Sequence, residues 1–407
     1  MTPHRIAALL RRQPQRRAAT LSRYRPSPIL PPVPPRHLLP LHGHSALRAR
    51  LAGAVSRGDL PSSLLIEGPR GVGKQQLALW LGRLLLCEDP ERDFLVDESG
   101  GPQAAGRVGD RAQCRTCKLT ESLQHPDLVW LFPRPRLKGS SDPDLADIRE
   151  DMAEGIAERL ANGGLYEPPG GDEGIFIATI RSIVQTAVLK PAMARRKVFV
   201  IGDADRMVSQ EGSDQAANAF LKLLEEPPAD TTIVLTSSEP GALLPTVRSR
   251  VIAVRALPLT DAEMKAFVED KKIAPLLDLS AKSAELVKSA SGAPGRLAER
   301  DAWTAAIDQA TRFLDAASAP ERGRRARVAL SQGVSGARGK FSDTLEALTS
   351  LLHDRAQAAA ERGEEKRARG AAHAIAIVER TKELATGNVN PQLLTAALIR
   401  DLAPLVR

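Results

Sequence analysis

The stretch that decides the fold is LLIEGPRGVGK, residues 64–74. Its first four residues predict a short strand, and the rest fits the pattern GxxxxGK. In that pattern the glycines let successive backbone N–H groups turn toward a phosphate, and the lysine neutralises the phosphate charge. Leucines then recur at helical spacing, so strand, glycine loop and helix together predict a phosphate-binding loop. Its candidate nucleotide-binding residues are Gly68, Gly71, Gly73 and Lys74.

Strands and helices alternate in the following part of the chain. Two apolar runs have the length of buried strands, and a longer amphipathic run precedes each of them. Such alternation argues for a parallel α/β sheet. The predicted elements are a helix over residues 177–189, a strand over 197–201, a helix over 213–226 and a strand over 232–236.

The chain is predicted to have four parts. Strand patterns end at Leu257, and the remainder reads as helices separated by turns that contain Gly and Pro. Two segments rich in Gly, Pro, Asp and Glu lack apolar periodicity and look like insertions, the second with an acidic helix over residues 143–162. The parts are an Arg- and Pro-rich extension (1–39), a P-loop domain (40–257, insertions about 88–113 and 133–174), a small helical unit (258–300) and a larger helical unit (301–407).

The excess positive charge lies at the start of the chain. Of 57 Lys and Arg against 49 Asp and Glu, eight arginines and no acidic residue fall within residues 1–40. The rest is neutral on average, so a nucleic-acid surface there would have to come from local arrangement. We expect the extension to be a disordered tail or an over-extended start site. An organellar transit peptide is the alternative, but nine prolines would break its helix.

Cysteine content and hydropathy indicate the cellular compartment of the protein. Three cysteines in 407 residues do not form a disulfide framework. The sequence has no signal-peptide core and no apolar run of about 18 residues that would predict a membrane helix. We therefore expect a soluble, cytoplasmic protein with no membrane partner.

Two positions near the phosphate loop depart from the residues that hold magnesium. Gln75 stands where a Ser or Thr hydroxyl is expected, and Gly202 stands where a metal-binding carboxylate should follow the strand over 197–201. If the strand is displaced by one residue from the usual register, the carboxylate of Asp203 could bind the metal instead. Alternatively, Asp203 and Asp205 cap a turn. ATP and magnesium are therefore candidate cofactors, with a magnesium position that lacks its usual ligands.

Residues 197–251 resemble the clamp-loader subunits of bacterial DNA polymerase III, which belong to the AAA+ class. The resemblance lies in AANAFLKLLEEPP (216–228), followed by a strand and then by RSR (248–250). It implies an AAA+ P-loop domain with a parallel sheet, a small helical lid and an all-α collar. These would be the parts at 40–257, 258–300 and 301–407.

The resemblance also implies an arginine finger. In these subunits a Ser-Arg pair after the sensor strand reaches the nucleotide of the neighbouring subunit, and Ser249 and Arg250 match that pair. The charge of Arg never titrates, and its fork can meet several phosphate oxygens at once. Arg250 is thus the candidate catalytic residue, acting in trans. A solvated loop charge is the alternative.

Two more nucleotide contacts follow from the same resemblance. Ser237 or Ser238 would occupy the nucleotide-sensing position, although paired serines at a strand end also form turns. SGAPGR, residues 291–296, is similar to the sensor motif of the lid, which makes Arg296 a candidate phosphate contact in the same chain. A plain loop is the alternative there.

The resemblance also implies a zinc site, of which this sequence has three of the four cysteine ligands. Relatives carry four cysteines that bind structural zinc, and Cys87, Cys114 and Cys117 match three of them. Arg111 stands at the position of the other cysteine, and His125 is a candidate fourth ligand or part of an ordinary turn. Alternatively, the cysteines pack a small loop without metal.

The resemblance is closest to the delta-prime type of subunit. It implies a protein that helps to load the sliding clamp onto primed DNA with the delta and gamma/tau subunits; polymerase activity would belong to the holoenzyme. An ATP-hydrolysing gamma/tau-type motor is the alternative, but Gln75 and Gly202 count against it. A metabolic P-loop kinase or transferase is a third possibility, which the RSR segment disfavours.

Overall fold

The computed structural model describes residues 37–90, 114–137, 143–165, 173–207, 214–274, 277, 283–331, 338–385 and 389–406. Almost all of the predicted extension, most of the first insertion and parts of the second lie outside these ranges. Leu38 and Leu39 already belong to the fold, because their backbone N–H groups donate to Glu121 O (3.0 Å) and Gly163 O (2.9 Å).

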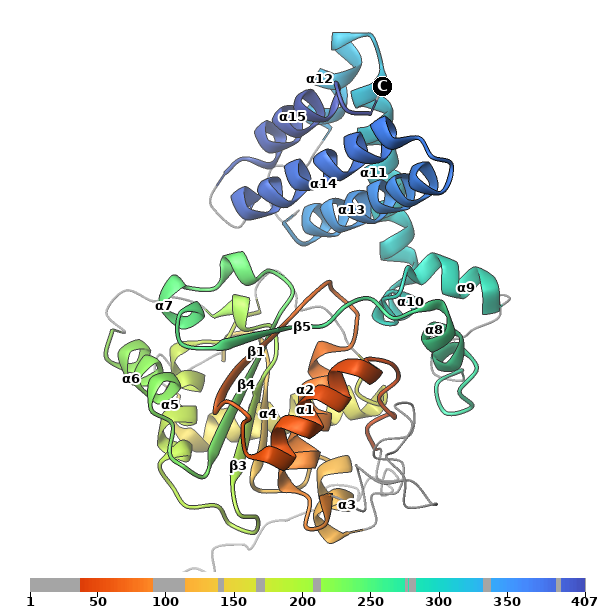
Figure 1. Cartoon of the computed structure of the whole chain (residues 1–407). Coiled ribbons are helices and arrows are strands. Elements are labelled where there is room, and N and C mark those ends of the chain that lie inside the picture. The colour runs from red at the N-terminus through yellow and green to blue at the C-terminus, as the bar shows by residue number, and fades with distance from the viewer. Residues whose placement is uncertain are drawn as a thin grey trace, which may run out of the picture. The chain divides into compact units, whose positions relative to one another are not determined.

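A five-stranded parallel sheet forms the centre of the P-loop domain (Figure 1). This confirms the predicted parallel α/β sheet and its three predicted strands. Two further strands were not predicted: β2 is apolar but has only four residues, and β5 is an edge strand with three of its four residues exposed. In the sheet order β2-β3-β4-β1-β5, the strands are β2 (Leu128–Leu131), β3 (Lys197–Ile201), β4 (Thr231–Ser237), β1 (Ser63–Glu67) and β5 (Ile252–Arg255).

Helices cover both faces of the sheet, as they must when a parallel sheet is buried on both sides. Side chains of β3 alternate: Val198 and Val200 pack into the cluster that contains α2, and Phe199 and Ile201 into the cluster with α5 and α6. The predicted helices over 143–162, 177–189 and 213–226 are confirmed as α4, α5 and α6. The helices of this domain are α1 (Ser45–Arg57), α2 (Lys74–Leu86), α3 (Arg115–Glu121), α4 (Leu145–Ala161), α5 (Ile177–Ala187), α6 (Asp214–Glu225) and α7 (Pro245–Arg248).

Only helices follow β5 within the described residues, as the sequence predicted. The first three enclose a small apolar cluster around Met264, Phe267 and Leu286. The later ones enclose a larger cluster around Phe313 and Leu348. The elements are α8 (Asp261–Val268), α9 (Ser283–Ala290), α10 (Gly295–Ala298), α11 (Arg300–Ser318), α12 (Arg322–Leu330), α13 (Arg338–Glu361), α14 (Glu365–Ala385) and α15 (Pro391–Leu402).

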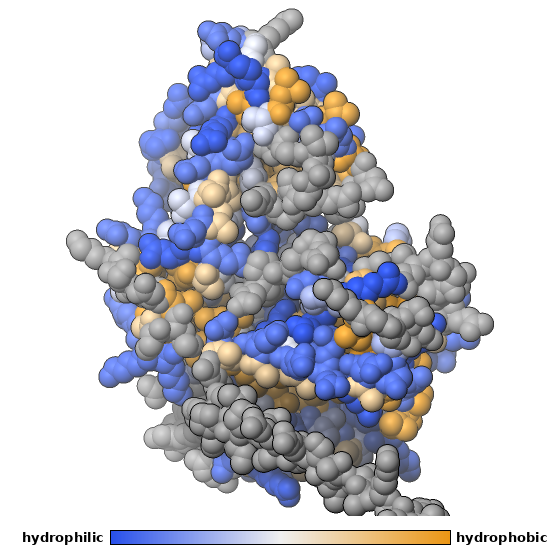
Figure 2. Space-filling view, turned by 180° about the vertical axis from the view of Figure 1, so that it is seen from behind, coloured by the Kyte–Doolittle hydropathy of each residue, from blue (hydrophilic) through white to orange (hydrophobic). Residues whose placement is uncertain are grey.

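Hydrophilic residues cover much of the coloured surface in Figure 2, with hydrophobic residues in smaller groups between them. Exposed apolar side chains are normal on folded domains, because there is not enough polar surface to cover one. Among the described residues, no helix is both long enough and apolar enough to cross a membrane.

Asp127 fixes the loop that leads into β3. Its carboxylate oxygens accept three backbone hydrogen bonds, from Ala192 N (2.6 Å), Met193 N (2.8 Å) and Ala194 N (2.8 Å), and its side chain is fully buried. Burial alone would raise the pKa of this carboxyl, but the three donors outweigh burial and hold the pKa below its ordinary value.

Asp127→Asn should lower the free energy of unfolding by about 2 kcal/mol near neutral pH, because a charge-assisted acceptor becomes an amide. A carboxyl with a depressed folded-state pKa contributes stability above its unfolded pKa of about 4 and loses it as pH falls through the folded pKa. The deficit measured by urea unfolding should therefore shrink in acid. Asp308→Asn, on an exposed position of α11, is the control; an equal effect of the two substitutions would contradict the assignment.

Candidate functional site

The loop between β1 and α2 has the backbone of a phosphate-binding loop. Gly68 and Gly73 have φ angles of 151° and 94°, which disfavour residues with a Cβ. A Cβ on Gly68 would lie 2.2 Å from Ala256 O, so this glycine is also required by close packing against the chain after β5. The turn ends at Gly73, and α2 begins at Lys74.

Lys74 is buried and already bonded within the protein. Its Nζ donates to Pro69 O and to Ser238 Oγ, both at 2.8 Å. Burial lowers its pKa to about 8, although Asp203 and Asp205 favour the charged form. Of the two serines considered for the sensing position, Ser238 therefore faces Lys74.

Ser237 lies one residue earlier and turns elsewhere. Its hydroxyl donates to Asp205 Oδ1 at 2.5 Å, and the backbone N–H of Glu239 donates to the same hydroxyl. Ser237 and Asp205 thus hold each other at the carboxyl ends of β4 and β3.

Gln75 fills the space beside Lys74 where the magnesium-binding hydroxyl was expected. Its Nε2 donates to Asp203 Oδ2 at 2.9 Å. Its Oε1 accepts from Trp130 Nε1 at 3.2 Å and from Arg159 Nη1 at 3.1 Å. The amide is therefore bonded at both ends inside the protein.

Asp203 lies in the site and faces Gln75. It has a φ of 47°, unusual for a residue other than glycine, and its side chain is 4% exposed. Burial, reinforced by repulsion from Asp205, raises its pKa to about 6, while Lys74 and Arg159 oppose the shift. The Asp203 side chain makes no cap hydrogen bond to the turn that follows and accepts from Gln75 instead.

The space between these groups is small. A cavity of about 30 Å³ is lined by Lys74, Gln75, Trp130, Arg159 and Asp203 together with the loop glycines. A single water needs at least about 10–15 Å³ by this measure, so the cavity is far too small for a triphosphate. In this conformation the space around Lys74 and Asp203 is closed, whereas a larger cavity of about 1250 Å³ lies on the side of Pro69, Val72 and Arg296.

Two arginines near the loop are engaged by acidic side chains. Arg70 is bonded to Asp343 of α13 and lies 3.9 Å from Glu299. Arg296 lies 4.0 Å from Glu346 of α13, and its guanidinium stacks on Trp303 at 3.8 Å from the ring centroid. Burial lowers the pKa of Arg296 to about 10, well above neutral pH.

The lid touches the phosphate loop directly. The backbone N–H of Gly295, at the start of α10, donates to Gly71 O at 2.9 Å. A Cβ on Gly71 would lie 3.3 Å from the Cα of Gly295, so the two backbones are in close contact. The predicted sensor Arg296 therefore lies beside the loop.

Arg250 is placed away from these groups, just after α7. Its Nε donates to Glu225 Oε1 at 2.6 Å, and its Nη1 donates to Thr246 O at 2.8 Å. The side chain is 27% exposed. Its charge is therefore held by surface contacts on α6 and α7 and stays accessible.

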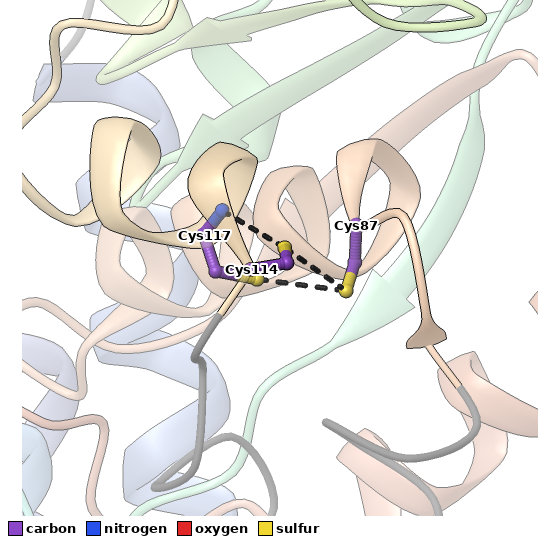
Figure 3. A group of neighbouring side chains, drawn as sticks. All are labelled: Cys87, Cys114 and Cys117. Carbon is purple, nitrogen blue, oxygen red and sulfur yellow. Dashed lines mark hydrogen bonds between the residues drawn. The ribbon is translucent and has the colours of Figure 1, made fainter.

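The three cysteines lie together although they come from separate segments (Figure 3). Cys87 follows α2, Cys114 caps α3, and Cys117 lies within it. The Sγ of Cys87 lies 3.9 Å from that of Cys114 and 3.5 Å from that of Cys117. Tetrahedral zinc with Zn–S bonds of about 2.3 Å requires sulfurs about 3.8 Å apart, so the three thiols fit a zinc ion.

A fourth zinc ligand is not found among the described residues. His125 does not belong to the cysteine cluster. It is buried, and its Nδ1 accepts from the backbone N–H of Asp127 at 3.1 Å, which supports the alternative that it shapes a turn. Arg111, at the position of the missing cysteine, lies outside the described residues.

Residues 43–260 match the family model described as DNA polymerase III, delta subunit. The chain belongs to this family. The matched residues include the phosphate loop, the three cysteines and Arg250, and they confirm the resemblance drawn from the sequence.

Several curated proteins are similar to about half of this chain. DNA polymerase III subunit delta' of Pseudomonas aeruginosa is 30% identical over 217 residues, 53% of this chain and 48% of that protein. The delta' subunit of Bacillus subtilis is 27% identical over 223 residues, 55% and 49% of the two chains. DNA polymerase III subunit gamma/tau of Mycobacterium tuberculosis is 27% identical over 245 residues, 58% and 33%. The chain thus spans about half the length of the delta' relatives.

The sequence did not point to Trp130 or Arg159. Trp130 lies on β2, which was too short to be predicted, and Arg159 lies near the end of the acidic helix in an insertion. An insertion has no fixed relation to the P-loop motif, so spacing along the chain could not connect the two. The only sequence signal was a buried-type apolar run, LVWLF, after the predicted turn at His125.

We propose that the three cysteines bind one structural zinc ion with help from water or another donor. Metal analysis of protein purified under reducing conditions without chelator should give about one zinc per chain. Cys117→Ser and Cys87→Ser should each reduce the content severalfold, because two thiolates hold zinc poorly. Zinc at background level in the unaltered protein would contradict the proposal.

Proposed function

We propose that this protein is a clamp-loader subunit of the DNA polymerase III holoenzyme, of the delta-prime type. It would help to load the sliding clamp onto primed DNA in an ATP-dependent reaction, and supply Arg250 to the nucleotide site of a neighbouring subunit. The observation that carries the proposal is the family match over residues 43–260, a stretch in which Arg250 is accessible and the chain's own phosphate loop is closed.

The geometry of the phosphate loop argues against hydrolysis by this chain. Catalysis of phosphoryl transfer depends on magnesium between the phosphates and on a residue that positions the attacking water. Gln75 and Gly202 replace two of the expected ligands, and the remaining space is about 30 Å³. An ATP-hydrolysing motor of the gamma/tau type is therefore the less supported alternative.

The surroundings of Arg250 suit a group that acts in another subunit. The side chain is held by Glu225 in a surface ion pair, and such pairs typically contribute only about 0–1 kcal/mol. Exchanging Glu225 for the phosphates of a neighbouring nucleotide would therefore cost little. A phosphate oxygen is also a strong acceptor for the planar guanidinium fork.

The proposed partners are the delta and gamma/tau subunits, the sliding clamp and primed DNA within the complex, with the cytoplasm as the location. Helices α11 to α15, which form their own apolar cluster, would be the collar that holds the subunits together. Polymerase activity would belong to the holoenzyme rather than to this chain.

Arg250→Ala should lower ATP hydrolysis at the neighbouring site of the reconstituted loader by at least about tenfold, because arginine fingers contribute large factors to phosphoryl transfer. Assembly, measured by gel filtration, should be unchanged. Arg248→Ala is the matched control, since Arg248 is exposed in the same RSR segment. Equal rates for the Arg250→Ala and unaltered complexes would remove the finger assignment.

The purified chain alone should hydrolyse ATP at background rate in a phosphate-release assay with magnesium. Lys74→Ala should leave that rate unchanged, because the lysine has no substrate to act on. Robust turnover that Lys74→Ala abolishes would place the protein in the motor class instead.

A further inference from the structure

Arg159 brings a permanent positive charge into the phosphate-loop site from outside the P-loop motif. It lies near the end of α4, and Arg134 holds that helix through Asp151 (3.1 Å) and Glu158 (2.8 Å). The Arg159 guanidinium packs on the ring of Phe132 at 3.7 Å from its centroid. The residue is only 9% exposed, so its charge is fixed in place.

The two departures from the magnesium-binding pattern are coupled in space. A Cβ on Gly202 would lie 2.5 Å from the Cδ and Oε1 atoms of Gln75. An acidic residue at position 202 and the observed Gln75 rotamer therefore exclude each other. Gln75 occupies the space that the Cβ of any side chain at position 202 would need.

Magnesium does not fit the donor set that results. It demands near-octahedral oxygen ligands at about 2.0–2.1 Å. The oxygen of Gln75 already accepts two hydrogen bonds, and Asp203 Oδ2 accepts one from the same amide. The Arg159 guanidinium beside that amide would repel a second cation.

We infer that Arg159 takes the place of the magnesium ion and that Gln75 links it to Asp203. The buried carboxylate of Asp203 is then balanced by Lys74 and Arg159, both of which favour its ionised form. The closed loop is a metal-free structural joint between the P-loop, the end of β3 and the inserted helix α4. This inference concerns the isolated chain and stands even if the loader role fails.

If Arg159 and Gln75 hold the closed loop together in this way, substitution of Arg159 should lower the stability of the protein. Arg159→Met keeps the length and packing of the side chain but removes the charge, so the melting temperature should fall by several degrees. Arg149→Met, at an exposed position of the same helix, is the matched control and should have little effect. In a double-mutant cycle, Arg159→Met and Gln75→Met should cost less together than the sum of the two single changes. Strict additivity, or an unchanged melting temperature for Arg159→Met, would overturn the inference.

Nucleotide binding gives a second and independent readout. Addition of ATP with magnesium should leave the melting temperature of the unaltered chain unchanged. Gln75→Thr/Gly202→Asp should also show no response while Arg159 remains. Adding Arg159→Met should produce stabilisation by ATP that EDTA abolishes. A magnesium-dependent shift of several degrees in the unaltered chain, or in the double variant that retains Arg159, would overturn the inference.

Discussion

The hydrogen bond from Gln75 Nε2 to Asp203 Oδ2 is the contact on which the closed state of the phosphate loop depends. It connects the first turn of α2 to the end of β3, where a P-loop protein would place its metal. Because Trp130 and Arg159 donate to the same amide, the bond also ties β2 and α4 to the loop. A buried polar network of this kind is stable only when its members are paired, which accounts for the closed state of the site.

Because this contact closes the phosphate loop, the residues that shape the loop differ from the residue proposed to act on a nucleotide. The glycines and Lys74 have structural roles in the backbone turn between β1 and α2: Gly68 is in close contact with Ala256, and Lys74 bonds to Pro69 and Ser238. The group best suited to act on a nucleotide is instead the accessible Arg250, beyond the sheet. In the proposed function, the P-loop serves as architecture while Arg250 acts on the nucleotide of another subunit.

The sequence predicted the parts of the fold that obey local rules. The strand over residues 197–201 and the helix predicted over 177–189, observed as Ile177–Ala187, have clear periodicity, and the glycine loop has a specific motif. Edge strand β5 escaped prediction because most of its residues are exposed. The placement of Arg159 could not be predicted, because the contact between residues 84 positions apart arises only when the inserted helix packs on the domain.

The most direct measurement is a structure of the reconstituted complex of this chain with the delta and gamma/tau subunits, magnesium and a non-hydrolysable ATP analogue. We expect the analogue in a neighbouring subunit, with the guanidinium of Arg250 within hydrogen-bonding distance of its phosphates. We expect the loop around Lys74 to remain closed by Gln75 and Arg159. An analogue with magnesium bound at Lys74 of this chain, and Arg250 still paired with Glu225, would contradict the central claim.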